Sequence, residues 1–212
     1  DGKPLYMVTT TLPRYFPLAP RIEGAKLPEA LGFRAEPLAD GGLRLRADAD
    51  GLRIARKLEP GASAYQLWLT TTIENLGSAP RKLRLIETTH HYVRRQDESG
   101  GLPFLGSHSP ALSHGLCRHA QDLEREDRSN LLTPHEWKDG VRFTAIENVY
   151  CVNALASEGG AGTTCRIQSE DRFAKGESEA DGSLLAAELG HPEITLAPGE
   201  KRTLRALAYV GQ

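Results

Sequence analysis

The seven histidines and three cysteines of this chain first suggest a metal site. His90 and His91 are adjacent on a predicted strand, so their side chains project to opposite faces and cannot easily bind one ion. A second group lies in a loop-rich segment and comprises His108, His114, His119 and Cys117. The spacing of that group matches no zinc-binding pattern. The sequence therefore predicts neither a metal site nor a cofactor.

The segment from Thr88 to Tyr92 could carry acid–base chemistry. It reads Thr-Thr-His-His-Tyr and is similar to the Asn-His-x-Tyr-Phe motif of aldose epimerases (mutarotases). Those enzymes use a histidine acid and a glutamate base on a sugar ring, and the resemblance places the acid at His91. The asparagine of the motif is absent here, and no later segment resembles the glutamate region of that family. We therefore expect a non-enzymatic protein without catalytic residues, and an epimerase-like enzyme is the alternative.

The two tryptophans are the candidate aromatic contacts. A carbohydrate-binding module without catalysis would need an exposed aromatic side chain such as Trp68 in a shallow groove. Trp137 begins a block of strands and is typical of a core corner. The formal net charge of −2 recommends neither nucleic acid nor an anionic membrane as a partner. No stretch approaches the roughly 20 apolar residues that span a bilayer.

The three cysteines, Cys117, Cys151 and Cys165, show no C-x-x-C spacing. One disulfide and one free thiol would fit an oxidising compartment, and three reduced thiols would fit equally well, so the count leaves the compartment open. Cys151 and Cys165 lie at unequal distances from the turn at residues 159–162, so they would not be opposite each other in a regular hairpin. Because a disulfide needs close Cβ atoms, a bridge would favour Cys117 with Cys165.

Alternating apolar residues between turn signals predict the antiparallel strands that must position these side chains. The first 40 residues are rich in proline and are expected to form edge strands and loops. Residues 43–58 predict a hairpin that turns at Asp50-Gly51. The other expected strands cover residues 65–74, 81–94, 137–156, 165–169 and 184–210, and the polar stretch 171–182 is an expected loop.

The C-terminal segment carries the strongest turn signal. A short strand at 193–196, the Pro198-Gly199 turn and a strand ending at Tyr209-Val210-Gly211 predict one hairpin. A similar phrase occurs upstream, where Pro60-Gly61 precedes a long strand that ends at Asn75. No fixed-period repeat accompanies it, which excludes a solenoid or propeller.

Residues 96–134 interrupt the strand pattern. This stretch is rich in glycine, serine and histidine, and it contains a charged run at 121–128 that predicts one short helix. Long connections within a compact domain are often functional. We therefore expect this connection to lie near a partner surface, although the residues that contact a partner are not identified by the sequence.

Several short motifs, in this order and spacing, resemble the large periplasmic domain of YidC-type membrane protein insertases. The resemblance extends over most of the chain, from Pro4 to Gly211. The motifs are Pro4-Leu5-Tyr6, Arg56-Lys57-Leu58 with Gly61 and Tyr65, Glu74-Asn75, Trp137 with Tyr150 and Ala154, Ala197-Pro198-Gly199-Glu200, and Tyr209-Val210-Gly211. Two positions depart from the family pattern, because Cys151 stands where a phenylalanine is usual and Gln212 where a proline is usual.

The resemblance implies that residues 1–212 are a single domain of a longer membrane protein. It implies an all-β fold, a twisted antiparallel β-supersandwich like that of galactose mutarotases, with one or two short helices in the connections. It also implies a non-catalytic role on the periplasmic side of the bacterial inner membrane. The implied partners are Sec translocon subunits and nascent membrane proteins, with no nucleic acid and no small-molecule substrate.

Overall fold

The computed structural model describes residues 17–28, 31–94, 113–120, 122–148, 150–157, 160–170 and 182–211. Within these residues the strands form two sheets, and one short 3-10 helix, η2 (Arg128–Leu132), lies in a connection. None of the helices in the described ranges is long and apolar enough to cross a bilayer. The expectation of an all-β antiparallel architecture is confirmed.

The smaller sheet has the order β1-β6-β13-β12-β9, and β14 also pairs with β6. Its strands are β1 (Pro20–Glu23), β6 (Arg81–Arg94), β13 (Gly182–Gly190), β12 (Thr164–Glu170), β9 (His135–Lys138) and β14 (Ile194–Leu196). The expected third long strand at residues 81–94 is therefore confirmed as β6.

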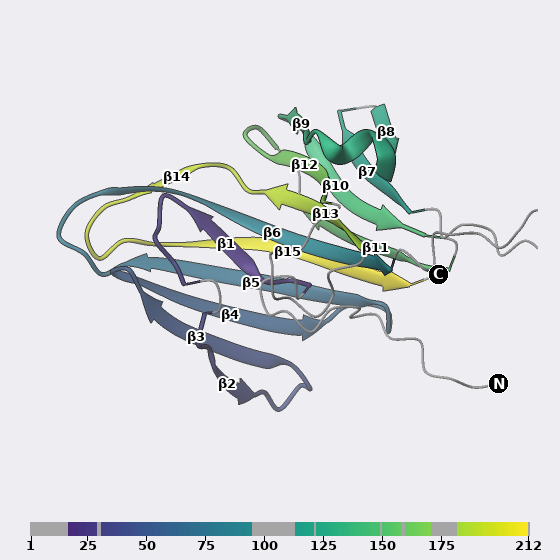
Figure 1. Ribbon diagram of the computed structural model, residues 1–212. Coiled ribbons are helices and arrows are strands. Elements are labelled where there is room, and N and C mark those ends of the chain that lie inside the picture. Colours follow the sequence, from purple (N-terminus) through teal and green to yellow (C-terminus); the bar gives the residue numbers. More distant parts are fainter. Residues whose placement is uncertain are drawn as a thin grey trace, which may run out of the picture.

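The larger sheet has the order β2-β3-β4-β5-β15-β11-β10-β7-β8, so the long strand β15 separates its two halves (Figure 1). Its strands are β2 (Arg34–Pro37), β3 (Leu43–Ala49), β4 (Leu52–Pro60), β5 (Gln66–Asn75), β15 (Lys201–Gly211), β11 (Val152–Ser157), β10 (Val141–Glu147), β7 (His114–His119) and β8 (Asp122–Asp127). The proline-rich N-terminal region contributes the edge strands β1 and β2, as its composition predicts.

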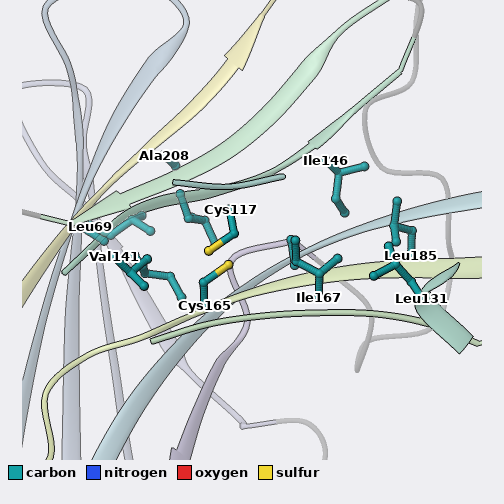
Figure 2. Packing of buried hydrophobic residues seen from close by; sticks show 13 residues of the cluster. Leu69, Cys117, Leu131, Val141, Ile146, Cys165, Ile167, Leu185 and Ala208 are labelled. Atoms are coloured by element: carbon teal, nitrogen blue, oxygen red, sulfur yellow. The ribbon is translucent and has the colours of Figure 1, made fainter. Parts of the chain in front are cut away.

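The core lies between the two sheets and consists of two apolar clusters. The first, here called the thiol cluster, consists of Leu69, Cys117, Leu131, Val141, Ile146, Leu155, Cys165, Ile167, Leu185, Ala187, Leu189, Ala206 and Ala208 (Figure 2). The second consists of Ile22, Leu52, Ile54, Ile73, Leu83, Leu85 and Leu196. Each fully buried leucine or isoleucine contributes about 1.5–3 kcal/mol relative to an exposed one, so these clusters hold the sheets together.

The β3–β4 hairpin is formed as predicted. Asp50 and Gly51 have φ angles of 49° and 70°. Two successive residues with positive φ are typical of the type I′ turn, whose twist matches that of the flanking strands. The Arg81 side chain fastens this turn, because its Nη2 lies 2.8 Å from Oδ2 of Asp50.

The predicted C-terminal hairpin is wrong, because its two strands belong to different sheets. β14 pairs with β6, whereas β15 pairs with β5 and β11. The turn between them is held by Asn75, whose side-chain amide donates to the carbonyl of Leu196 at 3.0 Å and to that of Ala79 at 2.8 Å. The Asn75 carbonyl also accepts from the Gly199 amide at 2.8 Å. The Pro198-Gly199 turn therefore connects the layers of the sandwich.

Replacing Asn75 with alanine is expected to lower the free energy of unfolding by about 2–3 kcal/mol, because the carbonyls of Leu196 and Ala79 and the amide of Gly77 lose their hydrogen bonds to its side chain. Asn75 is fully buried, so water does not replace the lost side chain. Urea unfolding of the variant should be compared with that of Asn130→Ala, which removes an exposed amide. Equal stability of the two variants would contradict a structural role for Asn75.

The predicted helix at residues 121–128 is also wrong. Asp122–Asp127 forms the edge strand β8, which pairs with β7. The run alternates in exposure with a period of two, and its charges protect the outer edge of the sheet from pairing with another chain. The short helix η2 follows this strand and buries Leu131 in the core. Residues 96–112 of the expected connection and 171–181 of the expected loop lie outside the described residues.

Candidate functional site

Alternation along β6 separates the two adjacent histidines, as the sequence predicts. Leu85 points into the core between the sheets, and Glu87 bonds there to Arg56 of the larger sheet. By the same period His91 lies on this inner face, where burial lowers the pKa of its imidazole. His90 lies on the outer face, which points away from the larger sheet, and it lines a cavity there. The two histidines of the epimerase-like motif therefore lie apart, with His91 between the sheets and His90 on the outer face.

A buried ion pair joins the two sheets on the inner face. Nη2 of Arg56 lies 2.7 Å from Oε2 of Glu87, and these side chains are 2% and 1% exposed. The Thr71 hydroxyl donates to the same carboxylate at 3.3 Å, and Arg56 also donates to the carbonyl of Leu18 at 2.5 Å. Burial, together with the Arg56 charge, lowers the pKa of His191 to about 4. This network is sealed from solvent, so it stabilises the sandwich rather than binding a ligand.

The outer face of the smaller sheet carries a cavity of about 500 Å³, here called the outer cavity. Strands β1, β6 and β13 are neighbours in the sheet, and their register places Thr88 opposite Glu188. The polar lining of the cavity consists of Arg21, Glu23, Thr88, His90 and Glu188. Its apolar lining comes from β1 and the segments around it, namely Ala19, Pro20, Ile22, Ala25, Leu27 and Pro28.

Arg21 forms ion pairs with both acidic side chains of the outer cavity. Its guanidinium lies 2.7 Å from Glu188 and 3.1 Å from Glu23, and the Glu188 side chain is only 11% exposed. A smaller cavity of about 130 Å³ adjoins it, shares both glutamates and adds Arg84, Arg166 and Glu136. Positive and negative side chains therefore balance one another within this surface, which suits a neutral polar or apolar group better than a free anion.

The two tryptophans have different surroundings. The guanidinium carbon of Arg205 lies 4.3 Å from the ring centre of Trp68, so a cation covers one face of that half-buried ring. Trp137 packs against the thiol cluster and lies 5.8 Å from the His135 ring. Trp137 therefore packs in the core. Trp68 does not offer both faces of its ring to a ligand, because Arg205 covers one of them.

The histidines considered as metal ligands have other partners. His114 lies 2.9 Å from Asp127, and His119 lies 3.3 Å from Glu124. In the described part of the chain, no group of three or more histidine, cysteine or acidic side chains could hold a metal ion. His108 lies outside the described residues.

The cysteines are arranged as the sequence reasoning favours. Cys117 on β7 and Cys165 on β12 are both fully buried, and their sulfur atoms point toward one another (Figure 2). Cys151 precedes β11 and is half-buried. The structure therefore brings Cys117 and Cys165 together, and a covalent bond between them stays a prediction.

Sequence reasoning missed Arg21 and Glu188 because these residues are 167 positions apart in the chain. Glu188 has a local signal, since it interrupts the apolar run from Leu184 to Leu189 within a strand. A charged residue in such a run is rarely buried without a partner. That rule could have identified Glu188 as a site residue, but it could not have identified Arg21.

Comparison with solved structures identifies the fold. A GH36 α-galactosidase from Geobacillus stearothermophilus matches with a TM-score of 0.53 and 11% identity over 92% of this chain. A galactose mutarotase-like protein from Lactobacillus casei matches with a TM-score of 0.50 and 10% identity over 84% of this chain. A putative aldose 1-epimerase from Escherichia coli matches with a TM-score of 0.50 and 14% identity over the same share. The chain thus has the β-supersandwich fold that galactose mutarotase-like proteins share, as the resemblance implies.

The chain covers 27% of the α-galactosidase, 72% of the mutarotase-like protein and 68% of the putative epimerase. The sequence matches no protein-family model and no curated protein. At identities this low, structural similarity establishes the fold alone, because one fold carries many unrelated functions.

Proposed function

We propose that this chain is a non-catalytic domain of a YidC-type membrane protein insertase, carried on the periplasmic side of the bacterial inner membrane. It would assist insertion by contacting Sec translocon subunits or nascent membrane proteins. The residues that carry the sequence resemblance support this proposal, because separate motifs contact each other in the fold. Asn75 pairs with Gly199 and Glu200, and the Tyr65 carbonyl accepts from the Val210 amide at 2.9 Å.

The pairing of both carboxylates of the outer cavity with one arginine is the observation that carries the non-catalytic part of the proposal. Arg21 binds both Glu23 and Glu188, which are the carboxylates that line this cavity. Arg21 bonds one oxygen of each carboxylate and offsets its negative charge. Because both carboxylates already have a fixed cationic partner, we favour binding over proton transfer in this cavity.

The position of the outer cavity suggests how a partner polypeptide binds. β1 is an edge strand of the smaller sheet and also lines the cavity. An extended peptide can add to a sheet edge through main-chain hydrogen bonds and gains specificity from a pocket for one of its side chains. We propose that a partner strand pairs with β1 and places one neutral side chain in the outer cavity.

Binding of purified Sec translocon in detergent to the immobilised chain tests this proposal. Ala19→Trp would fill the outer cavity without changing its charge, and it is expected to weaken binding about tenfold or more, the scale of an interface hot spot. Ser78→Trp, in an exposed turn, is the matched control and should bind like the wild type. Equal binding of the two variants would contradict the assigned surface.

An epimerase-like enzyme is the second candidate, because His90 and Glu188 line the same cavity. The motif places the acid at His91, but the cavity would give that role to His90 instead. This candidate therefore predicts a galactose-dependent thermal shift, together with mutarotation that is lost in His90→Ala. We expect neither effect.

We also expect the gene that encodes this chain to encode strongly apolar segments on both sides of it. The absence of such segments would refute the proposal of an insertase domain.

A further inference from the structure

Cys117 and Cys165 face each other across the interior of the sandwich. Cys117 belongs to β7 of the larger sheet and Cys165 to β12 of the smaller sheet. Both side chains are fully buried. Figure 2 shows the two sulfur atoms pointing toward one another within the thiol cluster. The pair therefore occupies the place where a single bond would connect the two layers.

The sheets approach each other closely beside this pair. Gly115 lies two residues before Cys117, and a Cβ atom on it would meet Cγ2 of Ile167 at 2.2 Å. Ile167 in turn lies two residues after Cys165 on the same face of β12. Glycine at position 115 thus lets β7 and β12 come close together. Close backbones are a condition for a disulfide, whose Cβ atoms lie about 3.5–4.5 Å apart.

Burial keeps both sulfur atoms away from external thiols and disulfides once the protein is folded. The hydrogen bond with Cys165 and burial raise the pKa of the Cys117 thiol well above its ordinary value. Only a thiolate attacks a disulfide, so a buried thiol of this kind exchanges slowly. The same burial would shield a finished bond from external reductants.

Cys151 does not compete for either partner. It lies outside the thiol cluster, just before β11, and its side chain is partly exposed. The two other cysteines point at each other and away from solvent. Among the three possible pairings, the structure favours one.

We propose that Cys117 and Cys165 form a disulfide that joins the two sheets, and that this bond closes while the chain folds rather than afterwards. Closure joins the two sulfur atoms and releases two protons and two electrons. The electrons reduce one disulfide of an oxidant, such as oxidised glutathione, to two thiols. Cys151 remains a free thiol.

The first test refolds the reduced protein from urea in a buffer of oxidised and reduced glutathione. Free thiols are then alkylated in fresh urea without reductant and counted by mass spectrometry. A cysteine that carries glutathione is recognised by the mass of the adduct and is not counted as part of a protein disulfide. We expect two cysteines to resist alkylation until reductant is added, and peptide mapping to link residue 117 to residue 165. The oxidised protein should melt about 10 °C above the reduced protein, because the bond closes a long loop in the unfolded chain.

Three alkylated thiols after oxidative refolding, or a bond that includes Cys151, would overturn the pairing. Cys151→Ala is the matched control and should form the same bond. Cys165→Ala should leave Cys117 reduced. The thiol count and peptide map of the wild type show whether the bond forms even if the Cys165→Ala variant does not fold.

The second test addresses the timing of closure. Reduced protein that is already folded is exposed to the same glutathione buffer without urea. We expect only Cys151 to react over the time in which the refolding sample forms the bond completely. Equally fast closure in both samples would refute formation during folding while leaving the pairing intact.

Discussion

Replacing Glu87 with glutamine is expected to lower the free energy of unfolding by about 3–5 kcal/mol, because Arg56 would remain charged, buried and without a counter-ion. The two side chains are 1% and 2% exposed and 2.7 Å apart, so water cannot solvate the remaining guanidinium. The Thr71 hydroxyl and the Leu18 carbonyl cannot replace a full negative charge. This is the largest effect of a single substitution that we predict for the chain.

Urea unfolding of the purified variant measures this effect. Glu193→Gln is the matched control, because it breaks an exposed ion pair with Lys82 and should change stability by about 0–1 kcal/mol. The double variant Arg56→Met/Glu87→Leu should recover much of the loss, since an apolar pair needs no counter-ion. A Glu87→Gln protein as stable as the control would show that the buried pair does not hold the sheets together.

Acidification is expected to destabilise the protein through His191 between about pH 6.5 and pH 4. Burial, and then the Arg56 charge, lower the pKa of this imidazole from 6.5 to about 4 in the folded state. Above pH 6.5 the imidazole is neutral in both states, so stability is fully retained. As the pH falls, the unfolded chain takes up the proton first, and the resulting loss reaches about 3 kcal/mol near pH 4. Below that pH the loss from this group stays constant.

A comparison of the wild type with His191→Gln isolates this contribution. Each protein is unfolded in urea at pH 7.5 and at pH 4.5. The wild type should lose about 2–3 kcal/mol more than the variant between the two conditions. Comparing changes with pH removes the constant effect of the substitution on packing. Equal losses would mean that the folded protein accommodates a charged imidazole at this position.

Local sequence determined many of the strands of this protein and the tight turn at Asp50-Gly51. The period of two in residues 81–94 predicts β6 with its observed ends. Asp50-Gly51 predicts the β3–β4 hairpin, because these residue types adopt positive φ at low cost. Both signals are contained within a few consecutive residues, so no distant contact is needed to interpret them. The single galactose mutarotase-like sandwich, in contrast, was expected from the family resemblance rather than from periodicity.

Tertiary contacts decided the features that local patterns misassigned. The charged run at 122–127 has helical character when considered alone, but pairing with β7 holds it as a strand. The Pro198-Gly199 turn looks like a hairpin loop, but the buried amide of Asn75 binds Leu196 and thereby directs β14 to the other layer. In both places long-range hydrogen bonds override local propensity, which contributes only a few tenths of a kcal/mol per residue.

The sequence by itself determined that this protein is an antiparallel β domain, and it placed adjacent His90 and His91 on opposite faces of one strand. Only the tertiary structure decided that His90 and Glu188 line one cavity and that Arg21 forms an ion pair with Glu188. It also decided that Cys117 meets Cys165 across the two layers. The physical reason is that a strand's period depends on neighbouring residues, whereas a site depends on which distant strands become neighbours when two sheets pack.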